Sequence, residues 1–182
     1  MATISVTSEA AIKGALSTYY TRLQIGLQRV LPAAADSMPP ADLSVMFASP
    51  MGAALVEIAQ VAEGTLEPDG AEKQALLRSI VDITVLLWNV EEPYASAVLA
   101  DPLGRILFDA WLRLTGDQLV TYAEAAELAG KRSETLAQMV TRGGLIRIVT
   151  PGEAFESRLL RSQVLALKER SATSRRGRKE SK

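Results

Sequence analysis

The sequence predicts a mainly α-helical protein made of a helical bundle and, nearer the C-terminus, a smaller unit with one β-hairpin. Apolar residues in the first two thirds recur at steps of three and four, which is the spacing of one helix face. After Leu119 the helix signals lie closer together, and a strand-like run leads into a Pro-Gly turn. With 182 residues, 48% hydrophobic and 23% charged, the chain can bury a sizeable core.

Helices are the only regular structure expected up to Gly116. The first runs from Ser8 to Leu31 and ends at Pro32, after which small residues up to Pro40 form a linker. Its apolar stripe consists of Ile12, Leu16, Tyr19, Leu23, Leu27 and Val30. Further helices are expected over residues 42–47, 51–63, 70–90, 94–100 and 102–116. Asp69 with Glu72 has the spacing of a helix cap, and Asp101-Pro102 is a typical helix start.

Two short helices separated by a tight turn are expected next. Thr121 and Glu124 have capping-box spacing, so each can bind the backbone amide of the other. Gly130 can adopt the left-handed conformation that ends a helix. Ser133 is expected to be the N-cap of the second helix, which Gly143-Gly144 stops.

A β-hairpin and another helix follow. Ile146 to Val149 has strand character, Thr150-Pro151-Gly152-Glu153 is expected to turn, and Phe155 to Leu159 is the return strand. Ser162 is then expected to cap a helix that continues through Lys168. Two helices, a sharp turn and a hairpin indicate a winged helix-turn-helix, whose second helix enters a DNA major groove while the hairpin meets the backbone or minor groove.

The same stretch resembles the small DNA-binding modules of the excisionase and MerR-type families. The matching positions are Thr121, Glu124, Ala125, Ala126, Leu128 and Gly130 at the opening, then Arg142, Gly144 and Leu145, and finally Arg158, Arg161 and Ser162. Gly144 is displaced by one residue, and Lys131 and Arg132 stand where the family usually places an apolar residue followed by Ser or Thr. The resemblance covers about the last third of the chain and implies double-stranded DNA as the ligand.

The residues expected to contact DNA lie in this unit and in the tail that follows it. They are Lys131, Arg132, Ser133, Thr135, Gln138, Thr141, Arg142, Arg147, Arg158, Arg161, Arg175, Arg176, Arg178 and Lys179. Gln138 can pair with adenine and Ser133 with a phosphate, whereas Glu134 repels phosphate unless it meets a cytosine amino group. Because six cations and six anions balance between Asp117 and Arg161, a helical domain or a winged helix that binds protein is the alternative.

Charge is distributed unevenly along the chain. Up to Gly116 there are seven cations and thirteen anions, and the excess of cations lies almost wholly beyond Ser162. Ser171 to Lys182 contains no apolar side chain larger than alanine and is expected to be a disordered, basic tail. Its Arg176-Gly177-Arg178 resembles the core of an AT-hook, without the flanking prolines. The expected domains are therefore 1–116, 117–170 and 171–182.

The composition removes several classes of chemistry. The chain contains neither cysteine nor histidine, so disulfides, the usual zinc ligands and most nucleophile–base pairs are excluded. Gly143-Gly144 lacks the Lys and Ser or Thr of a phosphate-binding loop. We therefore expect no catalytic residue, cofactor or metal site. Neither a signal peptide nor a membrane span is evident, which predicts a cytoplasmic, nucleoid-associated protein.

Together these features predict a double-stranded DNA-binding protein, specifically a transcriptional regulator that acts as a homodimer through its N-terminal helices. Tyr19-Tyr20 and the apolar run Ile83 to Trp88 are candidates for that interface, with the interior of the domain as the alternative place for them. Two other functions stay open. One is an architectural or recombination factor, closer to excisionase, that bends DNA. The other is a protein-interaction adaptor or an antitoxin that uses a winged helix to bind a partner.

Overall fold

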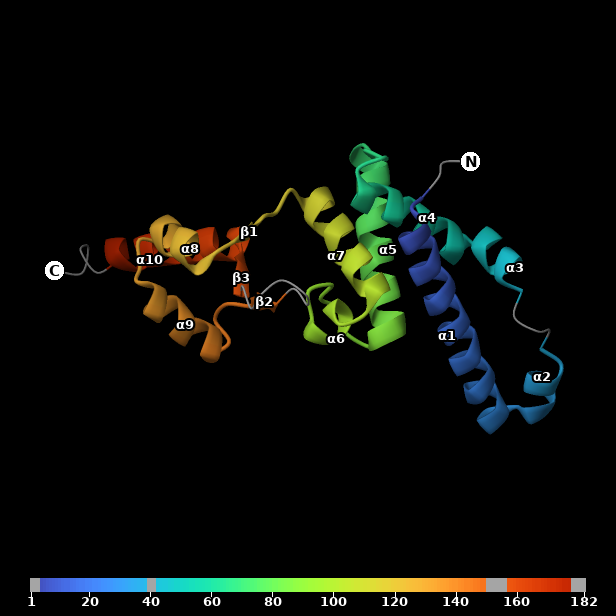
Figure 1. Cartoon of the computed structure of the whole chain (residues 1–182). Helices are drawn as coiled ribbons and strands as arrows, with labels where there is room; N and C mark the ends of the chain where they lie inside the picture. Colours follow the sequence, from blue (N-terminus) through green and yellow to red (C-terminus); the bar gives the residue numbers. More distant parts are fainter. Residues whose placement is uncertain (1–3, 39–41, 150–156, 178–182) are drawn as a thin grey trace. The chain divides into compact units, whose positions relative to one another are not determined.

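The computed structural model describes residues 4–38, 42–149 and 157–177, which form a mainly helical protein with one small antiparallel sheet (Figure 1). The chain divides into two compact units, Met1–Leu114 and Thr115–Lys182. No helix within the described residues is long and apolar enough to cross a membrane.

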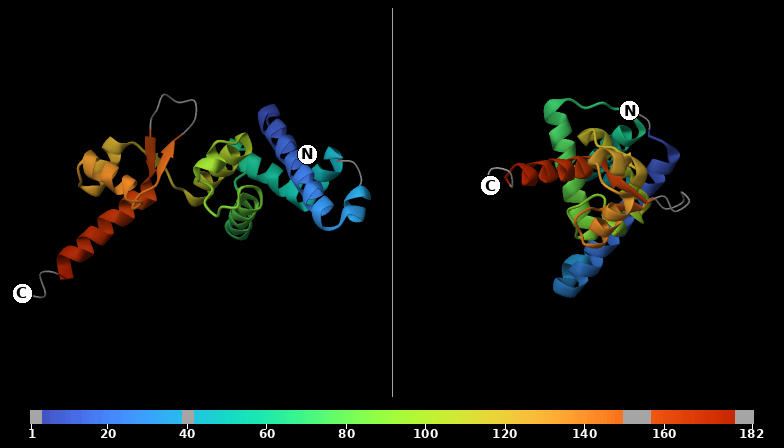
Figure 2. Two further views of the ribbon diagram at one scale, coloured as in Figure 1. Left: turned by 90° about the horizontal axis from the view of Figure 1, so that it is seen from below. Right: turned by 90° about the vertical axis from the view of Figure 1, so that its left-hand side faces the viewer.

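Seven helices make up the described part of the N-terminal unit. They are α1 (Val6–Val30), α2 (Pro32–Asp36), α3 (Leu43–Ala48), α4 (Pro50–Glu63), α5 (Gly70–Trp88), α6 (Ser96–Leu99) and α7 (Pro102–Thr115). Helix α2 lies inside the stretch expected to be a linker. It can begin at Pro32, because the first residue of a helix needs no partner for its amide. Figure 2 shows α1, α2 and α3 from two further directions.

Side-chain caps explain where several of these helices begin. Ser5 caps α1 by accepting a hydrogen bond from the amide of Ser8, so α1 starts two residues before the expected Ser8. Asp42 caps α3, and Ser49 caps α4 ahead of Pro50. Asp69 occupies the N-cap position of α5, but its side chain makes no capping hydrogen bond, so the expected capping pair with Glu72 is wrong.

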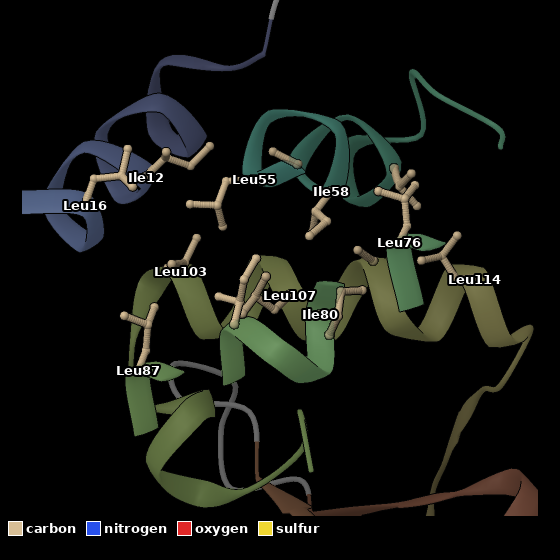
Figure 3. Packing of buried hydrophobic residues seen from close by; sticks show 14 residues of the cluster. Ile12, Leu16, Leu55, Ile58, Leu76, Ile80, Leu87, Leu103, Leu107 and Leu114 are labelled. Atoms are coloured by element: carbon tan, nitrogen blue, oxygen red, sulfur yellow. The ribbon is translucent and has the colours of Figure 1, made fainter. Parts of the chain in front are cut away.

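Leucine and isoleucine side chains from four helices form the core of the N-terminal unit (Figure 3). The fully buried members include Ile12 and Leu16 of α1, Leu55 and Ile58 of α4, Ile80 of α5, and Leu103 and Leu107 of α7. Helix α7 comes very close to the segment before it at Gly104, where an added Cβ atom would lie 1.9 Å from the carbonyl oxygen of Val98. Only glycine therefore fits at this point.

The predicted apolar stripe of α1 leaves the core halfway along the helix. Ile12 and Leu16 are buried, but Leu23 is 42% exposed and Val30 is 75% exposed. The stripe therefore packs inward only in the first half of the helix. A 3.6-residue repeat identifies a helix face, but it does not identify where the neighbouring helices that cover this face end.

The described part of the C-terminal unit combines three helices with a three-stranded sheet. Its elements are β1 (Leu119–Val120), α8 (Tyr122–Ala129), α9 (Ser133–Thr141), β2 (Arg147–Val149), β3 (Ser157–Leu160) and α10 (Arg161–Gly177). The strands are antiparallel in the order β1-β3-β2, with Val120 opposite Leu159 and Ile148 opposite Arg158. Strand β1 was not expected, since a two-residue strand leaves no periodic pattern in the sequence. The predicted turn at Thr150 to Glu153 lies outside the described residues.

A second, smaller core holds these elements together. It contains Val120, Ala125, Ala129, Leu136, Leu145, Leu159 and Val164, so β1, α8, α9, β3 and α10 all contribute to it. The alanines on α8 let the helix lie close to its neighbours, and Leu136 is the fully buried residue of α9. This small core fixes α9 at one side of the unit.

Helix α10 is longer than expected at both ends. It begins at Arg161 rather than after Ser162, and it continues to Gly177, past the expected limit at Lys168. The backbone of residues 171–177 is helical, so the start assigned to the disordered tail is wrong. Extending an existing helix loses much less conformational entropy than nucleating a new one. No proline occurs between Arg161 and Gly177 to interrupt the helix.

Candidate nucleic-acid interface

The N-terminus of α8 is fixed by a complete capping box, as predicted. The backbone amide of Thr121 donates to Glu124 Oε2 at 2.7 Å, and the amide of Glu124 donates to Thr121 Oγ1 at 3.2 Å. The hydrogen bonds that the Glu124 carboxyl accepts from the amide and the hydroxyl of Thr121, with a smaller effect of the Arg158 charge, hold the pKa of this carboxyl below its usual value. The box sets the direction in which the chain enters the two-helix segment.

The turn between α8 and α9 depends on a left-handed glycine. Gly130 has φ 61° and ψ 40°, which confirms its predicted role, and the amide of Lys131 donates to the carbonyl of Ala126 at 3.0 Å. Arg132 has extended backbone angles and is the N-cap of α9, so Ser133 is the first helical residue. The prediction that Ser133 is the cap is therefore wrong by one position.

Helix α9 has one buried side and one exposed side. Leu136 is fully buried, and Met139 and Val140 are half-buried beside it. The opposite side carries a row of exposed polar residues at steps of four and three, namely Glu134, Gln138 and Thr141. The hydroxyl of Thr141 donates to the carbonyl of Ala137, which leaves its oxygen as an acceptor and its methyl group free for apolar contact.

The C-terminal end of α9 is held by the loop that follows it. Arg142 is the C-cap, and Gly143 has φ 74°, while the amide of Gly144 donates to the carbonyl of Met139 at 2.8 Å. The amide of Ile146 donates to Gln163 Oε1 on α10 at 3.0 Å. Both ends of α9 are thus fixed to the rest of the unit by specific hydrogen bonds.

The predicted DNA-contacting residues fall into three groups. Exposed ones are Arg132, Ser133, Thr135, Gln138, Thr141 and Arg142 on or beside α9, with Arg147 on β2 and Arg161 at the start of α10. Lys131 and Arg158 are half-buried. Arg175 and Arg176 belong to α10, but their side chains are not described, and Arg178 and Lys179 lie outside the described residues.

The family models, curated proteins and solved structures compared with this chain give no match. The functional argument therefore rests on the geometry of the C-terminal unit. Within the described ranges, no group of three or more Asp or Glu side chains is placed to hold a metal ion.

Sequence reasoning missed one residue that organises the unit. Asp117 precedes β1, and its Oδ1 accepts a hydrogen bond from the amide of Ser162 at 3.0 Å, at the start of α10. The hydroxyl of Ser162 donates to Asp117 Oδ2. Aspartate is a common N-cap, but this one lies 45 residues from the helix it caps, so no local spacing rule could find it.

The six anions of this unit do not all oppose its six cations equally, because some of them are held at helix N-termini. Of the six anions counted between Asp117 and Arg161, two are occupied at helix N-termini: Asp117 at α10 and Glu124 at α8. There the partial positive charge of the helix end offsets part of their field. Glu127 on α8 and Glu134 on α9 are exposed as well.

Proposed function

We propose that the C-terminal unit is a winged helix-turn-helix that binds double-stranded DNA with α9 in the major groove, and that the chain is a transcriptional regulator. The row of exposed polar side chains on α9 supports this function most directly. A helix that presents amide, hydroxyl and carboxylate groups away from its core has the groups needed to bind base edges. Cationic Arg132 and Arg142 stand at its two ends, where a duplex would bring its phosphates.

The chemistry of the row implies a preference among bases. Gln138 would accept from and donate to adenine, and Glu134 would accept from the amino group of cytosine. The methyl group of Thr141 would meet the methyl group of thymine, since its hydroxyl already donates within the helix. A target that contains these bases in neighbouring positions would satisfy all three side chains.

A regulator of this kind would act as a dimer. One small winged helix contacts a single half-site, and two joined units contact two half-sites spaced by about one helical turn, near 34–36 Å. Footprinting separates a regulator from an architectural factor that bends DNA. A regulator protects one defined operator, whereas a bending factor protects many sequences alike.

The adaptor or antitoxin function is the second candidate, and Glu134 is the observation that favours it. Its carboxylate is exposed at the N-terminal end of the outward row, so it would repel phosphate wherever no cytosine amino group lies opposite. On a protein partner the same carboxylate could pair with an Arg or Lys side chain.

A mobility-shift titration of the full chain against random duplex at low salt tests the proposal. We expect retardation, and a double variant Arg132→Gln with Arg142→Gln should bind more weakly with a salt slope smaller by about two, since each lost phosphate contact removes about 0.9. The control is Lys73→Gln with Arg78→Gln, which removes the same charge from α5 and should leave binding unchanged. If no duplex is retarded even at low salt, the adaptor function replaces DNA binding.

A further inference from the structure

A groove of about 320 Å³ lies along one face of α1, beside the end of α5 and the start of α7. Its α1 wall consists of small residues, among them Ala11, Gly14, Ala15 and Thr18, and ends at Arg22. A Cβ atom added to Gly14 would meet no neighbouring atom within 4 Å, so the groove is open there. Another helix could therefore approach the backbone of α1 closely at this point.

The face that lines the groove continues toward the C-terminal end of α1. Ala11, Ala15, Thr18, Arg22, Ile25 and Arg29 are separated alternately by four and three residues, and we call these six residues the α1 seam. This 3.5-residue repeat is the pattern by which two helices pair along their length. The side chains of the seam are small in its first half and large in its second half, where Ile25 is 50% exposed.

We propose that a second copy of the chain covers the α1 seam by packing its own α1 against it in the antiparallel direction, about a two-fold axis near Thr18. In this arrangement Ile25 of each copy enters the groove beside Ala11 and Gly14 of the other. Large side chains then meet small ones at both ends, because a two-fold axis repeats each contact. With the axis near Thr18, residues 11–25 of the two copies lie opposite one another, over about 21 Å at 1.5 Å per residue.

The charges along the seam favour this direction and this occupant. The seam carries Arg22 and Arg29 and no carboxylate. A parallel pair would place each arginine against its own copy, which is repulsive, whereas an antiparallel pair places Arg22 against the small half of the seam. That half is flanked by the carboxylate of Asp101, which lines the same groove.

Two hydrogen bonds prepare the seam for such a contact. Arg22 Nη1 donates to the carbonyl of Leu87 at 2.8 Å, which draws the guanidinium to the edge of the seam and away from its centre. The hydroxyl of Thr18 donates to the carbonyl of Gly14 at 2.9 Å, so the methyl group of Thr18 is the part left for contact at the axis. The Thr18 hydroxyl therefore needs no new acceptor inside the interface, and the remaining N–H groups of Arg22 can bind water at the edge of the seam.

Cysteine cross-linking tests the geometry directly, because the chain contains no cysteine of its own. A residue at a two-fold axis faces its own copy, so Thr18→Cys should form a disulfide-linked dimer under mild oxidation without DNA. Ser17→Cys is the matched control, because Ser17 is also exposed but points about 100° away around the helix. It should cross-link no faster than random collision allows.

Filling the groove tests the same contact without a covalent bond. A Cβ atom at position 14 meets no atom within 4 Å in a single copy, whereas the leucine of Gly14→Leu would block Ile25 of the second copy. Gly26→Leu is the control, since this glycine lies on the same helix, also has no neighbour within 4 Å, and does not line the groove. In sedimentation equilibrium without DNA, Gly14→Leu should weaken the dimer at least about tenfold, and Gly26→Leu by less than about twofold.

This inference deepens the proposed function, because it names the surface that joins two DNA-binding units, yet the two fail separately. A chain that stays monomeric but still retards DNA overturns the α1 seam alone. A dimer that cross-links at Thr18 but retards no duplex overturns the DNA proposal alone. A dimer that survives Gly14→Leu, or that cross-links as fast through Ser17→Cys as through Thr18→Cys, pairs through another face and overturns the seam.

Discussion

The carboxylate of Asp117 caps the start of α10 by accepting hydrogen bonds from both the amide and the hydroxyl of Ser162. The same junction contains two more long-range contacts. The amide of Arg161 donates to the carbonyl of Gln118, and Leu119 pairs with Leu160 between β1 and β3. The first residues of the C-terminal unit are therefore bound to the start of its last helix, and α8 and α9 lie in the chain between these two points.

Removing the Asp117 carboxylate should loosen the start of α10. Loss of an N-cap side chain costs about 1 kcal/mol, so Asp117→Ala should lower the protection of the Gln163 and Val164 amides by about fivefold in hydrogen exchange. Asp69→Ala is the control, since Asp69 occupies the N-cap position of α5 without a side-chain capping bond. Equal loss of protection in the two helices would mean that the contact with Ser162 contributes nothing of its own.

Features fixed by neighbouring residues could be predicted from the sequence. The capping box of Thr121 and Glu124 and the left-handed Gly130 follow from residue types within one or two helical turns, and all are present. The exposed row on α9 likewise follows from the 3.6-residue repeat around the buried Leu136. Most of the candidate interface could therefore be predicted from local sequence patterns.

Features that depend on distant segments could not be predicted in this way. The cap of α10 needs Asp117, and β1 exists because Val120 pairs with Leu159. Arg158 looks like any surface cation in the sequence, yet in the sheet it stands opposite Ile148 and is half-buried. The point at which the apolar stripe of α1 becomes exposed likewise depends on where the neighbouring helices end. These properties belong to tertiary contacts, which a single sequence does not reveal.

Acid should weaken the N-terminal unit through Glu63. This carboxylate accepts hydrogen bonds from the Ser8 hydroxyl at 2.6 Å and the Ser5 amide at 3.0 Å, which lower the pKa of Glu63 in the folded state. A lowered pKa adds stability above the unfolded value near 4.5, and this stability is lost as pH falls through the folded value. The unfolding free energy should therefore decrease as the pH is lowered from about 4.5 through the folded pKa of Glu63.

The variant Glu63→Gln tests this assignment in thermal unfolding followed across the acidic range. It should be less stable than the unchanged chain at neutral pH, and the difference should shrink as the solution is acidified, because both chains then carry a neutral side chain at this position. Glu57→Gln, on the exposed side of the same helix, controls for the loss of one charge. A difference between Glu63→Gln and the unchanged chain that is constant with pH would exclude the Glu63 carboxylate as its source.

Base reading by α9 should depend on Gln138. In the proposed complex a glutamine–adenine pair contributes about 1–3 kcal/mol of discrimination, so Gln138→Ala should lower the preference for the best target by roughly fivefold or more. Binding to random duplex should change little, since phosphate contacts supply it. Competition binding with a selected target and random duplex measures both quantities. Equal weakening on all sequences would remove Gln138 from base reading.

The basic residues after Ser171 should supply phosphate contacts that the neutral unit lacks. Five cations, Arg175, Arg176, Arg178, Lys179 and Lys182, stand against Glu180 in this stretch. If four of the five meet phosphates, deleting residues 171–182 should reduce the slope of log affinity against log salt by about 3.6, at about 0.9 for each contact. Sequence preference should be unchanged, because these contacts carry no base information.

A variant in which glutamine replaces these five cations separates charge from chain length. It should reproduce the reduced salt slope of the deletion, since counterion release depends on charge and not on the presence of the backbone. A deletion that weakens binding while the glutamine variant does not would mean that the tail acts by contacting the protein. An unchanged slope in both would mean that residues 171–182 never reach the duplex, and the cations beside α9 would then have to account for all non-specific affinity.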